Sequence, residues 1–212
     1  MPAPLKSPPK RQPRMDLEVR RVQVLDAALR LVVRDGYAAA TMEAIAREAQ
    51  LAKPRVYAAY PGRGPLLLAL LEREQRRTID TLATAMPPFD DDSDFETILT
   101  TAATNLLHAV VEHPESALLL TAPADDAPAE VREHAARARA FARDNLRALI
   151  EWARPRRPDL SRLDPELLSI ALLAVGEQLV RLAVIDPDRY PPTHLADFVT
   201  TAVDHLSRPA GT

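Results

Sequence analysis

The stretch LAKPRVYAAYPGRG, which begins at Leu51, limits the fold of this chain more than any other segment. Pro54 and Pro61 leave room for only about seven helical residues, because proline is tolerated in the first turn of a helix and ends one elsewhere. A helix of that length is marginal in water unless other elements pack against it. The chain must therefore supply neighbouring helices that hold this one in place.

The segments on either side have the spacing of helices. An apolar stripe at intervals of three and four residues predicts a first helix from position 16: Val22, Leu25, Leu29 and Val32. Gly36 is suited to end that helix, and Thr41 to cap the next one. The proline-bounded helix is expected over residues 53–60, and a longer helix opens at Gly64.

The remainder of the chain continues the same pattern. No stretch alternates apolar and polar residues as a half-buried strand would. Five further helices are expected, at residues 95–110, 115–121, 129–153, 167–185 and 193–206. The sequence therefore predicts an all-α fold of about nine helices.

Charge divides the chain into two parts. Up to Asp80 there are 15 Lys and Arg against 9 Asp and Glu, a net charge of +6, and the rest has 12 against 21, a net charge of −9. Residues 1–15 hold five prolines and four Lys or Arg, so we expect a flexible basic arm. This asymmetry indicates a basic part that faces a polyanion, although chance and a solvated surface could also produce it.

Composition narrows the setting further. The chain has no cysteine, which excludes disulfides and thiolate sites. Its N-terminus lacks the apolar core of a secretory signal, and Glu177, Gln178 and Arg181 interrupt its most apolar stretch, so we expect no membrane span. These observations favour a soluble cytoplasmic protein.

A helix, a tight turn and a second helix form a helix-turn-helix, whose second helix enters the major groove of DNA. Three apolar positions of the short helix can anchor it against its neighbours: Leu51, Val56 and Tyr60. Its other face is then free to contact DNA: Lys53, Arg55, Tyr57 and Ala58. Lysine and arginine can bind phosphates or guanine edges, and tyrosine can donate to a phosphate.

Residues 18–77 resemble the DNA-binding domain of TetR-family transcriptional regulators. The matching features are Gly36-Tyr37 at the end of the first helix, Thr41 before Ile45-Ala46, Val56-Tyr57 in the short helix, Tyr60 after it, and Leu66-Leu67 in the fourth helix. The rest of the chain is similar to the family only in its helical character, its length and its last two helices.

The sequence departs from the family pattern at five positions. Gln50 occupies a turn position that is usually glycine, and it costs on the order of 1 kcal/mol if φ is positive there. Ala52 replaces the usual Ser or Thr cap, at a cost of ~1 kcal/mol. Ala58 and Ala59 replace bulkier residues, which leaves mainly apolar contact with thymine methyl groups. Arg63 retains the charge of a usual lysine that meets the DNA backbone.

The resemblance implies a dimeric repressor that a small molecule releases from a near-palindromic operator. The DNA-binding residues it implies are Thr41, Lys53, Pro54, Arg55, Tyr57, Ala58, Tyr60 and Arg63. It also implies a helix-turn-helix domain at residues 16–64, and a ligand-sensing and dimerisation domain at residues 65–212. The dimer would form through the last two helices, at about 166–186 and 193–206, because a helix that is apolar on all sides needs cover from a partner or from one larger core.

Other polar and aromatic residues give weaker signals. Seven in the acidic part could line a pocket for a small, apolar ligand: Asn105, His108, Phe141, Asn145, Trp152, Gln178 and Arg181. The histidine spacing does not predict a metal site, and no catalytic or cofactor motif occurs, so we expect neither an enzyme nor a cofactor. The alternative function is a helical binding or scaffold protein with a degenerate helix-turn-helix.

Overall fold

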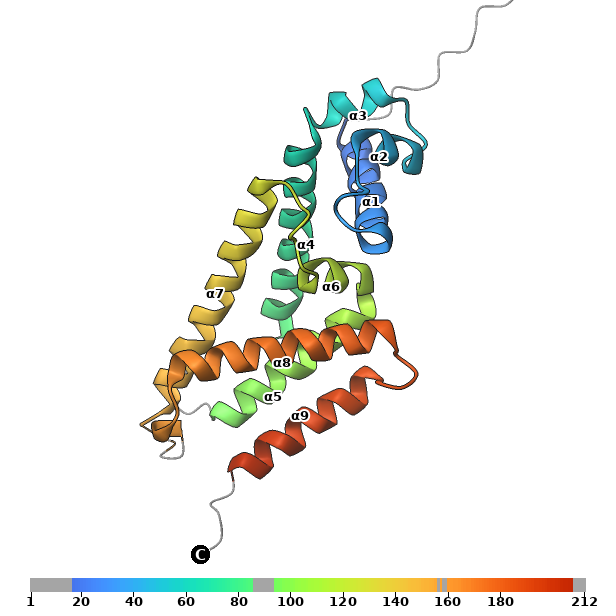
Figure 1. Ribbon diagram of the computed structural model, residues 1–212. Coiled ribbons are helices and arrows are strands. Elements are labelled where there is room, and N and C mark those ends of the chain that lie inside the picture. The colour runs from blue at the N-terminus through green and yellow to red at the C-terminus, as the bar shows by residue number, and fades with distance from the viewer. Residues whose placement is uncertain (1–16, 86–93, 156, 158–159, 208–212) are drawn as a thin grey trace, which may run out of the picture.

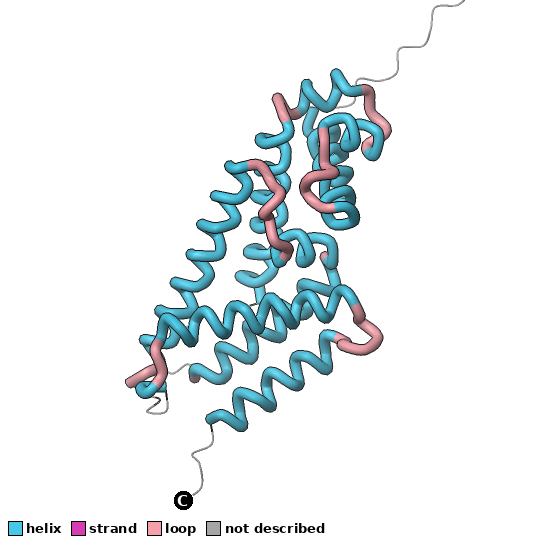
Figure 2. Tube along the Cα trace, in the orientation of Figure 1, coloured by secondary structure: helices cyan, strands magenta, loops and turns pink. Residues whose placement is uncertain are grey.

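The structure is a computed structural model that describes residues 17–85, 94–155, 157 and 160–207. All regular structure in these ranges is helical, and they contain no strand (Figure 2). The predicted all-α class is therefore confirmed. The expected basic arm, residues 1–15, lies outside the described residues.

The described residues form nine α-helices and one short 3-10 helix. They are α1 (Leu17–Asp35), α2 (Met42–Glu48), α3 (Lys53–Ala59), α4 (Arg63–Ala85), α5 (Phe95–Glu112), α6 (Pro114–Thr121), α7 (Ala129–Ala153), η1 (Leu160–Arg162), α8 (Pro165–Ile185) and α9 (Pro192–Ser207). The helix expected over residues 129–153 has the predicted bounds. The fourth helix begins at Arg63, one residue earlier than expected.

Local residue chemistry explains the first helix boundaries. Gly36 has φ of 83°, a left-handed conformation that glycine adopts without steric cost, and its N–H donates to the Val32 carbonyl at 2.9 Å. The hydroxyl of Thr41 accepts a hydrogen bond from the Ala44 N–H at 3.1 Å. The predicted cap of α2 is therefore confirmed.

Helices α2 and α3 lie at one end of the molecule, while α8 and α9 lie toward the other (Figure 1). One continuous hydrophobic core fills the α1–α4 region, and Ile45, Val56 and Leu66 are fully buried in it. The same core includes Leu119 from α6 and Val131 from α7. The expected boundary at residues 64 and 65 thus falls within one packed cluster.

The opposite end is packed less completely. Helix α8 contacts α5, α6 and α7, and α9 packs mainly against α5. Only two small buried clusters occur there, one around Leu107 and Val180 and one around Ile150. Several large apolar side chains remain exposed on α8 and α9: Leu167, Ile170, Val175, Ile185 and Phe198.

Within the described residues, α8 alone is long and apolar enough to cross a membrane by length and composition. Two of the polar residues that interrupt it contact neighbouring helices. Glu177 pairs with Arg139 of α7, and Arg181 donates to the carbonyl of Thr121 at the end of α6 at 2.9 Å.

Candidate nucleic-acid interface

Helix α3 is held by one face and exposed on the other. Val56 is fully buried and Ala59 is 5% exposed, while Leu51 packs on the edge of the same core. The side chains of five predicted DNA-binding residues are exposed on the opposite face: Lys53, Pro54, Arg55, Tyr57 and Ala58. The tertiary support expected for this short helix is therefore present, and Ala59 belongs to the core rather than to the exposed face.

The turn between α2 and α3 carries backbone strain. Gln50 has φ of 54°, the only positive value among the described residues other than glycine. Its N–H donates to the Arg47 carbonyl at 3.0 Å, and the side-chain amide of Gln23 in α1 donates to the Ala49 carbonyl at 2.8 Å. Ala52 precedes α3 without a side-chain cap. The positive φ on which the expected cost at Gln50 depends is therefore present, and so is the missing side-chain cap at Ala52.

An ion pair joins the first turns of α2 and α3. The ammonium of Lys53 donates to the Glu43 carboxylate, and it lies 5.9 Å from the centre of the Tyr57 ring. The hydrogen bond from Lys53 lowers the pKa of Glu43, and the same bond raises the pKa of Lys53. Sequence patterns did not identify Glu43, because its partner is ten residues away on another helix.

Two predicted DNA-binding residues point into the protein. The Arg63 guanidinium donates to the carbonyl of Ala40 at 3.1 Å and to that of Tyr37 at 2.6 Å. It therefore fixes the loop between α1 and α2. Tyr60 caps the end of α3 and is half-buried, and this burial raises the pKa of its phenol.

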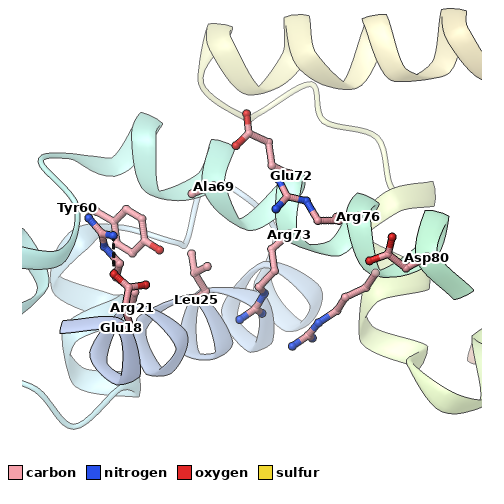
Figure 3. Close-up of a pocket in the computed structure, with 10 residues that line it drawn as sticks. Glu18, Arg21, Leu25, Tyr60, Ala69, Glu72, Arg73, Arg76 and Asp80 are labelled. Atoms are coloured by element: carbon pink, nitrogen blue, oxygen red, sulfur yellow. Dashed lines mark hydrogen bonds and ion pairs between the residues drawn. The ribbon is translucent and has the colours of Figure 1, made fainter. Parts of the chain in front are cut away.

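Tyr60 lines a cleft of about 440 Å³ between α1 and α4 (Figure 3). Leu25 and Ala69 supply apolar lining. Charged residues of both signs supply the rest: Glu18, Arg21, Glu72, Arg73, Arg76, Arg77 and Asp80. The charges in this cleft nearly balance, so it presents no uniform field to an anion.

The loop between α6 and α7 contacts the helix-turn-helix region at the α1–α2 loop. The Asp126 carboxylate accepts a hydrogen bond from the Ala38 N–H at 2.9 Å. Burial and, to a smaller extent, the charge of Asp126 raise the pKa of Tyr37 to about 12. At the start of α4, a Cβ added to Gly64 would lie 1.6 Å from a carboxylate oxygen of Glu130 in α7. The α1–α2 loop and the start of α4 are therefore packed against the acidic part of the chain.

A buried carboxylate makes a second connection. Glu74 of α4 is fully buried, accepts a hydrogen bond from the Ser116 hydroxyl of α6 at 2.5 Å, and pairs with Arg73 at 2.5 Å. Arg73 also pairs with Asp26 of α1 at 2.7 Å. This network joins three helices through residues that are up to 90 positions apart in the sequence, which is why no local motif predicts it.

The predicted ligand residues are spread over α5, α7 and α8. His108, Phe141, Asn145 and Gln178 are exposed, whereas Asn105, Trp152 and Arg181 are partly buried. Trp152 packs beside the cluster around Ile150, and Arg181 holds the end of α6. None of the seven lines the α1–α4 cleft. In the described part of the chain, no group of three or more His, Asp and Glu residues is placed to hold a metal ion.

Comparison with known proteins gives a family match and a fold match. Residues 24–70 match the family model described as bacterial regulatory proteins, tetR family. The chain is similar over 92% of its length to the structure of a TetR-like transcriptional regulator from Rhodococcus sp. RHA1, with 26% identity, 97% of that chain covered and a TM-score of 0.72. No curated protein sequence matches the chain significantly.

Two further structures share the fold. The fatty acid degradation regulator FadR from Bacillus halodurans is 18% identical, with a TM-score of 0.68 and coverage of 92% of this chain and 96% of that one. A bacterial regulatory protein in the tetR family from Rhodococcus RHA1 is also 18% identical, with a TM-score of 0.71 and coverage of 91% and 98%. The similarity therefore extends over nearly the whole chain.

Proposed function

Because the chain belongs to the TetR family of bacterial regulatory proteins, we propose that it is a dimeric repressor that a small molecule releases from its operator. The observation that carries this proposal is the exposed face of α3. Lys53, Arg55 and Tyr57 project from a helix whose opposite face is locked by Val56. Two such helices would enter successive major grooves of a near-palindromic site, about 34 Å apart.

The contacts at this interface have separate roles. Thr41 and Tyr57 fix the position of the protein on phosphates, and Lys53 and Arg55 read bases. Pro54 and Ala58 contribute apolar contacts with thymine methyl groups. Two of the predicted residues act indirectly. The side chain of Arg63 holds the α1–α2 loop, and that of Tyr60 lines the α1–α4 cleft. The basic arm, residues 1–15, adds affinity through its charge.

A second copy of the chain would cover the exposed apolar side of α8, with α9 beside it. Few residues of α8 are fully buried within the protomer, and a two-fold partner would cover the exposed apolar side chains of Leu167, Ile170 and Val175. A small molecule bound among α5, α7 and α8 would shift the spacing of the recognition helices, and the seven ligand candidates lie on these helices. We place the protein in the cytoplasm, where its operator is located.

A mobility-shift assay with DNA from upstream of the protein's own gene tests the proposal. We expect the protein to form a salt-sensitive complex with this DNA. The double substitution Lys53→Ala with Arg55→Ala should lower the affinity by roughly 100-fold or more. The matched control is Arg137→Ala with Arg147→Ala, which removes the same charge from the exposed surface of α7. If the wild-type protein binds no duplex even at low salt, the alternative of a helical binding or scaffold protein with a degenerate helix-turn-helix is favoured instead.

A further inference from the structure

The ion pair between Glu43 and Lys53 lies on the outer surface of the helix-turn-helix. The two side chains are 58% and 51% exposed, so both are accessible to a bound DNA. Lys53 is on the side where α3 exposes Arg55 and Tyr57, and Glu43 reaches it from the first turn of α2. A carboxylate therefore lies within a surface that otherwise presents hydrogen-bond donors.

Lys53 has an electrostatic reason to keep this partner. It is the first residue of α3, where the partial positive charge of the helix N-terminus disfavours a cation. The first turn of α3 contains no acidic residue, and Ala52 provides no cap. Glu43 supplies the missing negative charge from α2, and the Tyr57 ring limits the ammonium on another side.

The pair also changes what Lys53 offers to DNA. A free lysine adds sequence-independent attraction to phosphates, whereas contacts with base edges provide specificity. An ammonium has three donors, and Glu43 uses one of them. Two remain, which is the number that the O6 and N7 acceptors of guanine require. A carboxylate next to the ammonium also opposes its approach to a phosphate.

We propose that Glu43 is a specificity-determining residue of the DNA-binding surface, which keeps Lys53 from acting as a general phosphate contact and orients it toward a guanine edge. This proposal rests on the proposed DNA-binding function and adds a residue that contributes through Lys53. Its signature is a change in the ratio of specific to non-specific affinity.

The test uses the full-length protein and two duplexes of equal length. One duplex is selected by the wild-type protein from a random-sequence library, and the other has random sequence. For Glu43→Gln we expect affinity for the random duplex to rise about 3- to 10-fold, because Lys53 is free to pair with a phosphate. The salt slope, which is the slope of log affinity against log salt concentration, should then steepen by about 0.9 per subunit. Affinity for the selected duplex should change less, so the specificity ratio falls. Glu133→Gln, an equal charge change on the exposed face of α7, should leave the ratio unchanged.

A double-mutant cycle with Lys53→Gln separates orientation from simple repulsion. If Glu43 acts through Lys53, then Glu43→Gln should not steepen the salt slope when Lys53→Gln is already present. An equal steepening of the salt slope in that background would overturn the proposal. So would a Glu43→Gln variant whose specificity ratio equals that of Glu133→Gln. A loss of binding to the selected duplex that is equally large in the Lys53→Gln background would also overturn it, because Glu43 would then read a base directly. A wild-type protein that binds neither duplex overturns the proposed function, and this inference with it.

Discussion

The two ends of this molecule bury their apolar surface to very different extents. Around α1–α4 one continuous core is closed within a single chain, and α6 and α7 contribute Leu119 and Val131 to it. Around α8 the buried clusters are small, and Val175 remains 53% exposed. Helix α8 is among the most apolar of the chain, yet Ser169, Val180 and Ala183 are its only fully buried residues. The difference shows that the helix-turn-helix end closes its core within the protomer, whereas the other end leaves apolar side chains exposed.

The largest expected effect is on dimer stability, and it comes from a charge placed among the exposed apolar residues of α8, which include Leu167, Ile170 and Val175. Val175→Asp should weaken the proposed dimer by on the order of 3 kcal/mol or more, because each subunit would bury an uncompensated carboxylate. Sedimentation equilibrium at several protein concentrations measures the change. Ile79→Asp is the matched control, since Ile79 is 59% exposed on α4, a helix outside the proposed dimer surface. If Val175→Asp leaves the mass unchanged from that of the wild type, α8 is not the dimer surface.

The α1–α4 end, called the closed end below, depends for its stability on a buried charge as well as on apolar packing. Glu74→Ala removes the carboxylate that binds Arg73 and the Ser116 hydroxyl, and should lower the free energy of unfolding by about 3 kcal/mol. Urea denaturation measures the loss. The neighbouring Glu72 is exposed on the same helix, and Glu72→Ala should change the free energy by less than about 0.5 kcal/mol. Equal losses for the two variants would show that the network does not support this end.

Sequence analysis predicted the features whose causes are local. The cap at Thr41, the left-handed Gly36 and the bounds of α7 each depend on residues a few positions apart. Features that depend on distant partners were not predicted. The short periodicity of α3 did not show that Ala59 faces the core, and a charge pattern did not show that Arg63 turns toward two backbone carbonyls.

The ligand residues show the same limit more strongly. Spacing along a helix identifies residues that share a face, but it does not give the orientation of that face after packing. Phe141 was a candidate for lining a mainly apolar pocket, yet it is 67% exposed on α7 in the protomer. Arg181 was a candidate for the same pocket, and its guanidinium contacts the last turn of α6. Several helices packed together form a pocket, and the sequence of one helix does not show how the others pack against it.

A pH titration would test how tightly the closed end is sealed at its α1–α2 loop. Tyr37 has a pKa of about 12 in the fold, against 10.0 as a free phenol, mainly because it is buried. Below pH 10 the phenol is neutral in both states and has no effect on the pH dependence. Between pH 10 and 12 only the unfolded chain loses the proton, so stability should fall by roughly 2 kcal/mol as pH rises through this range.

Urea denaturation at pH 9 and pH 11 of wild type and Tyr37→Phe checks this effect. The variant should lose less stability than the wild type between the two pH values. Tyr57→Phe removes a hydroxyl from the exposed face of α3 and is the matched control. Parallel losses in Tyr37→Phe and wild type would mean that water reaches the loop, and that the closed end is less sealed than its packing indicates.

The smallest effect concerns strain that remains inside the closed end. Gln50 has φ of 54°, where a residue with a Cβ costs roughly 1–2 kcal/mol and glycine costs little. Because glycine also loses more backbone entropy on folding, Gln50→Gly should raise stability by only about 0.5–1 kcal/mol, or roughly 1–4 °C in melting temperature for a chain of this size. Gln50→Ala shortens the side chain but keeps the Cβ, so it should bring no such gain. A glycine variant no more stable than the alanine variant would place the strain elsewhere. A gain confined to glycine would show that the core tolerates a strained turn because α2 and α3 are held by their buried faces, and the turn only joins them.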